Sequence, residues 1–279
     1  MQGHRPDARE SAVRASLSKA LTFHASFDHG PDADFGVGDK RIYSVADEEG
    51  GQVAALTPGL GQPPLAIAQG RGRFGAALEF TLENSHVVLY KAARNVAYSP
   101  EAFRGTASLW MSLDPAGIPE RYCDPFQLTD KDYSDACIWA DFTKNDTPSD
   151  FRLGCFGDRS VWDVTDQAGR SEEFFFRLVK VAEPPFAKGQ WTHVVITWDG
   201  VNTTQPGRAR LYLNAEYRGA TSVIPERFTW DVAKANIRLG TGHYVGLFDD
   251  IAFFGRPLAA EEIRVLYGLE GGVAELRDR

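Results

Sequence analysis

The stretch GLFDDIAFFGRPLAAEEIRVLY, residues 246–267, decides the fold class, because it sets an apolar strand directly before a short amphipathic helix. Asp249 and Asp250 interrupt the apolar run. Neighbours in a strand face opposite sides of a sheet, so the alternation predicts that one of these carboxylates points to the core. Burying a lone carboxylate is costly, so that group is expected to be paired or metal-bound.

Upstream, short apolar or alternating runs are broken by Gly, Pro, Asn and Asp, which is typical of an all-β sandwich. The pattern predicts one jelly-roll-like domain over residues 21–279, after a tail or short helix at 1–20. Long connections lie at 35–70, 159–189 and 218–235. The predicted strands are 21–27, 76–80, 86–90, 105–113, 125–129, 136–143, 151–157, 191–199, 209–219, 236–241 and 246–255.

The net charge of −8 and the pI near 5.3 argue against nucleic acid or an anionic membrane as the main partner. No apolar run reaches membrane-spanning length, so no membrane insertion is expected. Residues 1–20 lack the apolar region of a signal peptide, which predicts a cytoplasmic location for the chain as given, or a secreted or periplasmic one if a signal was removed. The oligomeric state is left open.

The three cysteines, Cys123, Cys137 and Cys155, show no C-x-x-C spacing and cannot all pair within one chain. Free thiols are the main expectation, and one disulfide with a spare thiol is the alternative. The Phe174–Phe176 cluster is interpreted as a buried strand, with a protein interface as the alternative. His193, in a strand with two apolar faces, is expected to be a core histidine.

Face parity sorts the strands between residues 105 and 158 into an apolar and a polar–aromatic side. If four of these strands share one sheet, its outer face combines aromatic rings, an amide, a guanidinium and carboxylates, a mixture typical of a sugar-binding surface. In the alternative, Trp139 lies under a long loop and Arg152 only pairs with Asp141 or Asp158 across strands. The predicted ligand-binding residues are Trp110, Gln127, Trp139, Asp141, Arg152, Phe156 and Asp158.

Five motifs in order, covering most of residues 21–269, resemble a known family. They are LTFHASFD (21–28), GRFGAALEF (72–80), WTHVVITWDG (191–200), ARLYLNAEYRGA (209–220) and the 246–267 stretch. Their order is similar to that of bacterial laminin-G-like domains, which are concanavalin A-like jelly rolls. The resemblance implies an all-β sandwich of two antiparallel sheets with a short C-terminal helix.

The chain departs from the family pattern in three places. Asn214-Ala215 stands where Asn-Gly or Asp-Gly is usual, which makes the hairpin turn less obvious. Ala259 replaces the usual Ser or Thr before the last helix, although Glu261 and Glu262 suit its first turn. Residues 115–190, which hold the predicted binding face, match no motif.

In this family the last strand lies beside the first, which implies that Asp250 lies near Asp28. Calcium binds six to eight oxygen ligands, and the loop FDHGPDADFGVGD (27–39) offers several carboxylates. A structural calcium ion is therefore expected on Asp28, Asp32, Asp34 and Asp250. The alternative is that these carboxylates accept backbone N–H bonds or pair with arginines; a transition metal involving His24 and His29 is a further alternative.

The fold hosts both lectins and enzymes, so it does not settle function. A glycan- or protein-binding module leads, because no E-x-D-x-x-E-like pattern of a retaining hydrolase is present. A polysaccharide lyase or glycoside hydrolase is the alternative, and a purely structural or assembly domain is the second. For an enzyme, the expected catalytic residues are Asp141, Arg152, Asp158, Gln127 and Tyr244, with His243 as another possible base.

Overall fold

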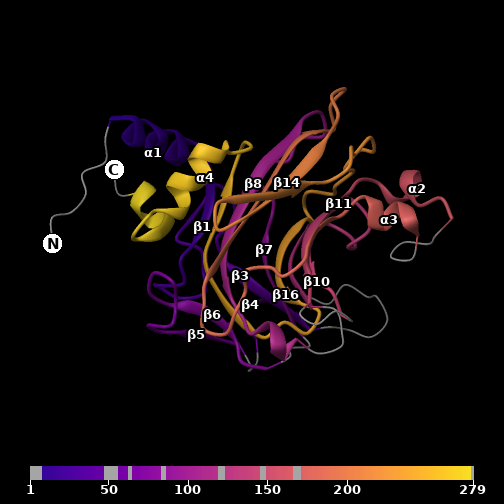
Figure 1. The fold of residues 1–279 in the computed structure, drawn as a ribbon. Coiled ribbons are helices and arrows are strands. Elements are labelled where there is room, and N and C mark those ends of the chain that lie inside the picture. Colours follow the sequence, from indigo (N-terminus) through magenta and orange to yellow (C-terminus); the bar gives the residue numbers. More distant parts are fainter. Residues whose placement is uncertain are drawn as a thin grey trace.

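The computed structural model describes residues 8–46, 56–61, 65–82, 86–118, 123–144, 149–165 and 171–277. Two antiparallel sheets pack face to face, with helices on both outer sides (Figure 1). Sheet A follows the order β15-β14-β13-β8-β17-β1-β2, and β6 and β5 extend it beyond β17. Sheet B follows the order β12-β11-β10-β9-β16-β7-β3-β4. This confirms the predicted concanavalin A-like β-sandwich.

The strands of sheet A are β1 (Leu21–Ala25), β2 (Phe35–Gly36), β5 (Leu65–Ala68), β6 (Ala77–Phe80), β8 (Phe103–Ser112), β13 (Thr192–Val201), β14 (Arg208–Leu213), β15 (Glu216–Ala220) and β17 (Gly246–Phe254). The strands of sheet B are β3 (Ile42–Ala46), β4 (Thr57–Pro58), β7 (His86–Lys91), β9 (Cys123–Thr129), β10 (Cys137–Phe142), β11 (Phe151–Phe156), β12 (Val179–Val181) and β16 (Asn236–Thr241).

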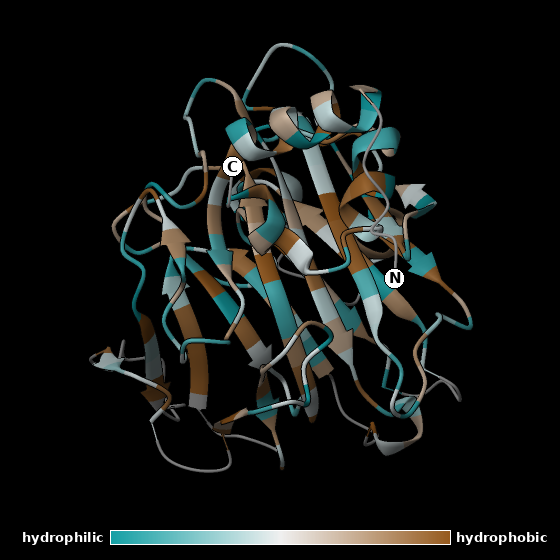
Figure 2. Cartoon of the chain, turned by 90° about the vertical axis from the view of Figure 1, so that its left-hand side faces the viewer, coloured by the Kyte–Doolittle hydropathy of each residue, from teal (hydrophilic) through white to brown (hydrophobic). Residues whose placement is uncertain are grey.

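The main core lies between the two sheets, where inward-facing side chains alternate with outward-facing ones along each strand. Figure 2 shows this alternation as brown and teal segments along the strands. Trp198 of β13 and Tyr90 of β7 are among the largest fully buried side chains. The three cysteines are buried and free, as expected.

All the predicted strands form, and the long connections contain additional elements. The 35–70 connection includes β2 to β5, and the 159–189 connection includes β12 with two short helices, α2 (Arg159–Trp162) and α3 (Glu172–Phe176). The expectation of a buried strand at Phe174–Phe176 is wrong. These residues form α3, which buries Phe174 and leaves Phe175 and Phe176 exposed. Ser171 starts this helix by accepting a hydrogen bond from the Phe174 N–H.

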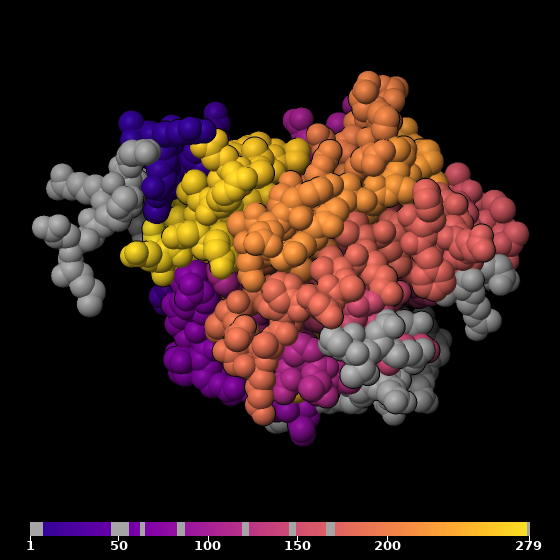
Figure 3. Space-filling view, in the orientation of Figure 1, coloured from indigo at the N-terminus to yellow at the C-terminus, as the bar shows by residue number. Residues whose placement is uncertain are grey.

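Sheet A is covered on its outer face by α1 (Ala8–Ala20), α4 (Ala260–Tyr267) and the 3-10 helix η2 (Gly272–Leu276). Figure 3 shows the indigo α1 against the yellow C-terminal segment. Leu17 of α1 is fully buried in this second apolar cluster. Glu262 closes the start of α4 by accepting the Ala259 N–H at 2.9 Å, although Ala259 itself offers no cap.

The aspartate pair of β17 lies in a β-bulge, which overturns the prediction that one carboxylate faces the core. The pairing with β8 shifts between Asp249 and Ala252, and Asp250 has φ of +49°. The bulge adds one residue, so both carboxylates lie on the outer side of sheet A. The Asp249 carboxylate accepts the Phe74 N–H at 2.9 Å, while Asp250 accepts the Val273 N–H and contacts the His24 ring at 2.7 Å.

The hairpin between β14 and β15 forms without the usual glycine. Asn214 has φ of +51° and Ala215 has φ of +62°, the two positive values that a type I′ turn requires. Asn214 also accepts the His193 N–H at 2.9 Å through its side-chain oxygen. Tertiary contacts therefore hold a turn in which Ala215 is locally unfavourable.

Candidate functional site

The predicted ligand-binding face of sheet B is covered by the segment that follows β11. Trp139 of β10 stacks on Phe156 at a ring-centroid distance of 6.1 Å and on Phe174 of α3 at 6.2 Å. Trp162 of α2 packs on Phe156 at 4.9 Å. These rings form a third buried cluster, outside the main core. Trp139 and Phe156 therefore offer no open stacking surface in this structure.

Beside this aromatic cluster, Asp141 and Arg152 form a cross-strand ion pair. Arg152 Nε donates to one Asp141 oxygen at 2.8 Å and Nη2 donates to the other, so the contact is bidentate. Both side chains are buried. Burial raises the pKa of the Asp141 carboxyl, and Arg152 opposes that rise. Gln127 of β9 lies opposite Trp139 in the strand register and is also buried.

Trp110 lies in the other sheet, so the expectation that it shares a face with Trp139 is wrong. It belongs to β8 of sheet A, where its ring stacks on His193 at 4.8 Å and on Tyr267 of α4 at 5.5 Å. His193 is buried there and shares a hydrogen bond with the Ser108 hydroxyl at 2.8 Å. Parity assigned a side to each residue, but it carries no information about which sheet a strand joins.

Two of the predicted catalytic residues lie apart from Asp141 and Arg152. Tyr244 is fully buried among Phe80 and Phe248, and its hydroxyl donates to the Leu247 carbonyl at 3.0 Å. Asp158 lies beyond the end of β11 and caps α2 by accepting the Ser160 N–H and hydroxyl. These contacts lower the pKa of the Asp158 carboxyl. Neither arrangement matches the expected lyase base or the Asp141–Asp158 pair.

The four aspartates expected to bind calcium are each held by hydrogen bonds to different groups. Asp28 accepts the Ala76 N–H at 2.7 Å, Asp32 accepts the Ile42 N–H at 2.9 Å, and Asp34 accepts the Ser26 N–H at 2.7 Å. Asp250 is engaged by His24 and Val273. Within the described ranges, no group of three or more His, Cys, Asp or Glu residues is placed to hold a metal ion. The carboxylates do not fit one calcium site.

One carboxylate that the sequence analysis did not select is Asp124 of β9. It is partly exposed, and burial, followed by the neighbouring charge of Asp141, raises its pKa to about 7. Arg152 opposes the rise. The sequence could not indicate Asp124 as a site residue, because β9 bulges against β10 between the positions opposite Ala140 and Phe142. Simple alternation therefore does not tell which face of sheet B the Asp124 side chain occupies.

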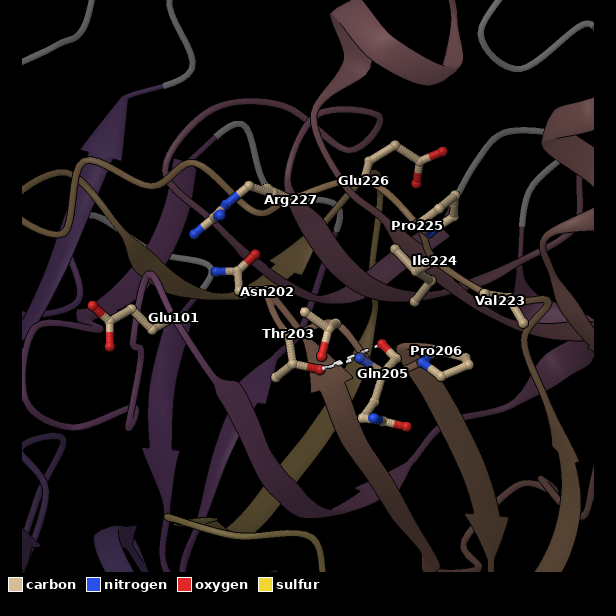
Figure 4. Close-up of a pocket in the computed structure, with 11 residues that line it drawn as sticks. Glu101, Asn202, Thr203, Gln205, Pro206, Val223, Ile224, Pro225, Glu226 and Arg227 are labelled. Atoms are coloured by element: carbon tan, nitrogen blue, oxygen red, sulfur yellow. Dashed lines mark hydrogen bonds between the residues drawn. The ribbon is translucent and has the colours of Figure 1, made fainter.

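An open pocket of about 630 Å³ lies at one end of the sandwich, next to the hairpin between β13 and β14 (Figure 4). Its remaining walls come from residues 223–227 and from Glu101, ahead of β8. Asn202 joins these walls: its amide donates to the Ser99 and Phe228 carbonyls, and its oxygen accepts the Phe228 N–H at 2.7 Å. The pocket therefore has a wall that is held in place before any ligand binds.

The pocket lining is rich in hydrogen-bonding groups. Gln205, Thr204 and Glu101 are exposed and line the space, and Arg227 adds a guanidinium that donates to the Pro100 carbonyl. Figure 4 shows Glu101, Gln205 and Arg227 projecting from three separate segments around it. Glu226 is buried and ion-paired with Arg177 at 2.8 Å, so it anchors the wall to the end of α3. None of the predicted site residues lines this pocket.

The laminin-G-type model of the concanavalin A-like lectin/glucanases superfamily matches residues 125–264, which is half of the chain. The chain belongs to this superfamily. No curated protein matches its sequence. Within the described residues, the helices are too short or too polar to span a membrane.

Among solved structures, the protein is similar to domain 4 of AbnA, an extracellular arabinanase from Geobacillus stearothermophilus, in complex with arabinotriose. The TM-score is 0.51 at 18% identity, with 88% of this chain and 96% of that chain covered. It is also similar to the ligand-binding domain of botulinum neurotoxin serotype D in complex with N-acetylneuraminic acid, with a TM-score of 0.58 at 11% identity. That match covers 91% of this chain and 52% of the neurotoxin chain, so this protein spans about half of it. These likenesses concern the fold.

Proposed function

We propose that this member of the superfamily is a carbohydrate-binding module that holds its glycan in the pocket beside the β13–β14 hairpin. The observation that carries the proposal is the preformed, open pocket lined by an amide, hydroxyls, a carboxylate and a guanidinium. Such groups pair with sugar hydroxyls, and a site fixed in advance loses less conformational entropy on binding.

The structural neighbours support the same ligand class. The AbnA domain holds arabinotriose and the neurotoxin domain holds N-acetylneuraminic acid, both on a related sandwich. The Trp139 face is less suited to this role, because α2 and α3 cover its rings. That cover is the feature expected of a structural or assembly domain, but it leaves the hairpin pocket open.

In the proposed complex, Gln205 and Thr204 donate and accept hydrogen bonds from one wall, and Glu101 accepts from the opposite side. Arg227 donates with the N–H groups not used by Pro100. Asn202 does not contact the glycan and is a positioning residue, since its side-chain amide groups are already engaged by backbone groups. Pro206 and Pro225 offer apolar ring faces on which a sugar ring can pack.

A glycan array that includes neutral oligosaccharides, arabino-oligosaccharides, sialylated glycans and glycoproteins identifies the ligand, and calorimetric titration then measures its affinity. Gln205→Ala should weaken binding by roughly fivefold to tenfold, the effect of losing one or two hydrogen bonds. Gln190→Ala, at an exposed glutamine outside the pocket, is the matched control. Full affinity in Gln205→Ala and in Glu101→Gln would exclude the pocket as the binding site.

The same titration with a chelator tests the predicted calcium ion. Because Asp28, Asp32, Asp34 and Asp250 are engaged by separate hydrogen-bonding groups, the proposal contains no bound metal, and an unchanged affinity is expected. A loss of affinity that added calcium restores would place a metal in the binding mechanism.

A second candidate function, glycoside hydrolysis, is favoured by the position of Asp124. A carboxyl with a pKa of about 7 keeps its proton in about half of the molecules at neutral pH, which suits a general acid, and the charge of Asp141 contributes to this raised pKa. Release of reducing sugars from a polysaccharide panel is the test. Turnover by the wild type that Asp124→Asn abolishes, with binding retained, would establish the enzyme; binding without product in both proteins supports the module.

A further inference from the structure

The outer side of sheet A carries a group of exposed or partly exposed arginines on two strands and on the helix α4. We call the set of Arg104, Arg208, Arg210 and Arg264 the arginine patch. Its members come from β8, β14 and α4. Phe103 and Ala209 are fully buried in the main core, so their strand neighbours Arg104, Arg208 and Arg210 point to the outer side.

The strand register places the members on β8 and β14 close together. Arg208 of β14 lies opposite Asp199 of β13. Arg104 of β8 lies beside the bulge of β13 that follows Trp198. Arg210 lies opposite Thr197, one row further along. Neighbouring strands are about 4.8 Å apart, and successive residues on one face of a strand are about 7 Å apart, so these three side chains share one small surface.

The charges of the patch are largely uncompensated. Arg104, Arg210 and Arg264 make no hydrogen bond or ion pair with any residue of the described chain, and Arg208 makes one long bond, to the Thr221 carbonyl at 3.4 Å. Asp199 is the acidic side chain in these rows, and its carboxylate accepts the Gly200 N–H. A cluster of free guanidinium groups is unexpected on a chain whose net charge is −8.

Two tyrosines extend the patch. Tyr217 of β15 is 57% exposed, and its ring lies 5.4 Å from that of Tyr212 of β14. Burial raises the pKa of the Tyr212 hydroxyl, and the charges of Arg210 and Arg264 both oppose that rise, so the β14 and α4 members both lie near this tyrosine. An exposed aromatic face therefore adjoins the guanidinium groups.

We propose that the arginine patch binds an anionic polysaccharide, one that carries carboxylate or sulfate groups along its chain. Guanidinium groups form forked, charge-assisted hydrogen bonds with such anions, and the Tyr217 ring can stack on a sugar face between them. A membrane fits less well, because a single exposed tyrosine offers little apolar surface to insert into a bilayer.

This second site does not depend on the hairpin pocket. None of the four arginines lines the pocket, and the two sites use different chemistry: neutral polar groups with charges of both signs in the pocket, and positive charge alone on the patch. The two can therefore be disabled separately.

The experiment measures binding of the full chain to immobilised dextran sulfate and polygalacturonate, with uncharged dextran as the blank and phosphatidylserine vesicles as the lipid arm. The proteins are the wild type, Arg104→Gln/Arg210→Gln, Arg94→Gln and Gln205→Ala. Arg94 is exposed and, like Arg104 and Arg210, makes no hydrogen bond or ion pair within the described chain, so it is a matched control. Thermal unfolding of each variant confirms that it is folded.

We expect the wild type to bind at least one polyanion and not dextran, with affinity that falls as salt is added. The double variant should bind at least tenfold more weakly, while Arg94→Gln and Gln205→Ala bind as the wild type. Equal binding by the double variant, an equal loss in Arg94→Gln, or binding of vesicles alone would overturn the proposal, as would no binding of either polyanion by the wild type. Loss in Gln205→Ala alone would assign the polyanion to the pocket.

Discussion

The two outer faces of the sandwich differ in how their buried polar groups obtain hydrogen-bond partners. Both carry polar groups where strands are covered by helices. On sheet A, Asp249 and Asp250 are satisfied by backbone N–H groups of Phe74 and Val273, from distant segments. On sheet B, aromatic rings of α2 and α3 cover Trp139, and Asp141 is satisfied by the Arg152 guanidinium of the adjacent strand.

The difference shows that buried carboxylates have different structural roles on the two sheets. The carboxylates of sheet A hold a loop and the C-terminal segment against the sandwich, so they act through the backbone of other elements. The polar groups of sheet B are satisfied within neighbouring strands, and the cover over them depends on ring packing. Removing a group should therefore release a distant segment on sheet A and a local cover on sheet B.

The largest expected effect comes from the aromatic cover on sheet B. Trp139→Ala removes the ring that lies over Gly154 and contacts Phe156 and Phe174, and should lower the free energy of unfolding by about 4 kcal/mol. Denaturant unfolding measures this loss. Phe176→Ala on α3, at a ring that is 76% exposed, is the control and should change little. Similar losses in both variants would mean that the cover is not held by the Trp139 stack.

The corresponding substitution on sheet A is Asp250→Ala. It leaves the Val273 N–H and the buried His24 ring without their acceptor, so a loss of about 3 kcal/mol is expected. Hydrogen exchange should also show faster exchange in η2, which this carboxylate anchors. Glu270→Ala, at an exposed acidic residue, is the control. A loss below 1 kcal/mol without faster exchange in η2 would contradict the anchoring role.

A smaller effect should appear in the pH dependence, because burial raises the pKa of Asp249 from its ordinary 3.8 to about 8. Between these values the folded protein holds a proton that the unfolded chain releases, so the free energy of unfolding falls as pH rises. Burial lowers the pKa of His193 to about 3, which gives the opposite slope, but only up to about pH 6.5.

Asp249 dominates the slope from pH 7 to pH 8, because Asp124, whose pKa is raised to about 7, has already lost about half of its proton at the start of this window. We expect the wild type to lose about 1 kcal/mol across this window and Asp249→Asn to lose much less. Denaturant unfolding at closely spaced pH values measures both slopes. Parallel slopes in the two proteins would show that another group titrates here.

The smallest expected effect is a gain, at the start of the helix that covers sheet A. Ala259 has extended backbone angles and no capping side chain, so Ala259→Ser should add a hydrogen bond and about 1 kcal/mol of stability. Ala260→Ser, one residue inside the helix, is the matched control and should bring no gain. Thermal unfolding measures both changes. A lower stability of Ala259→Ser would mean that the Glu262 contact already satisfies the N-terminus of α4.

The fold could be predicted because its determinants are local and repeated. Alternating apolar residues mark each strand, and the 246–267 stretch marks the last strand and its helix. The same reasoning missed β2 to β5 and β12, since strands of two to five residues give too short a pattern. It also misassigned Phe174–Phe176, where a serine cap and one buried ring form a helix turn that resembles a buried strand in sequence.

The candidate sites could be predicted less well. Parity put Asp141, Arg152 and Asp158 on one face and left open which aspartate pairs with Arg152; the strand register sets Asp141 opposite Arg152. Parity failed for Trp110, which belongs to the other sheet, and for the Asp249–Asp250 pair, where a bulge changes the parity. The hairpin pocket had no sequence signal, since Asn202, Glu101 and Arg227 meet only through the packing of three connections.

The sequence alone determined the sandwich, the C-terminal helix and the superfamily, because hydrophobic periodicity acts over a few residues at a time. Only the tertiary structure decided which strands share a sheet, which rings are covered, and where unpaired arginines gather. Those outcomes depend on strand order, bulges and long connections, and each of them brings together residues that are far apart in the chain. For this protein, the fold is therefore a local property of the sequence, and the binding surfaces are not.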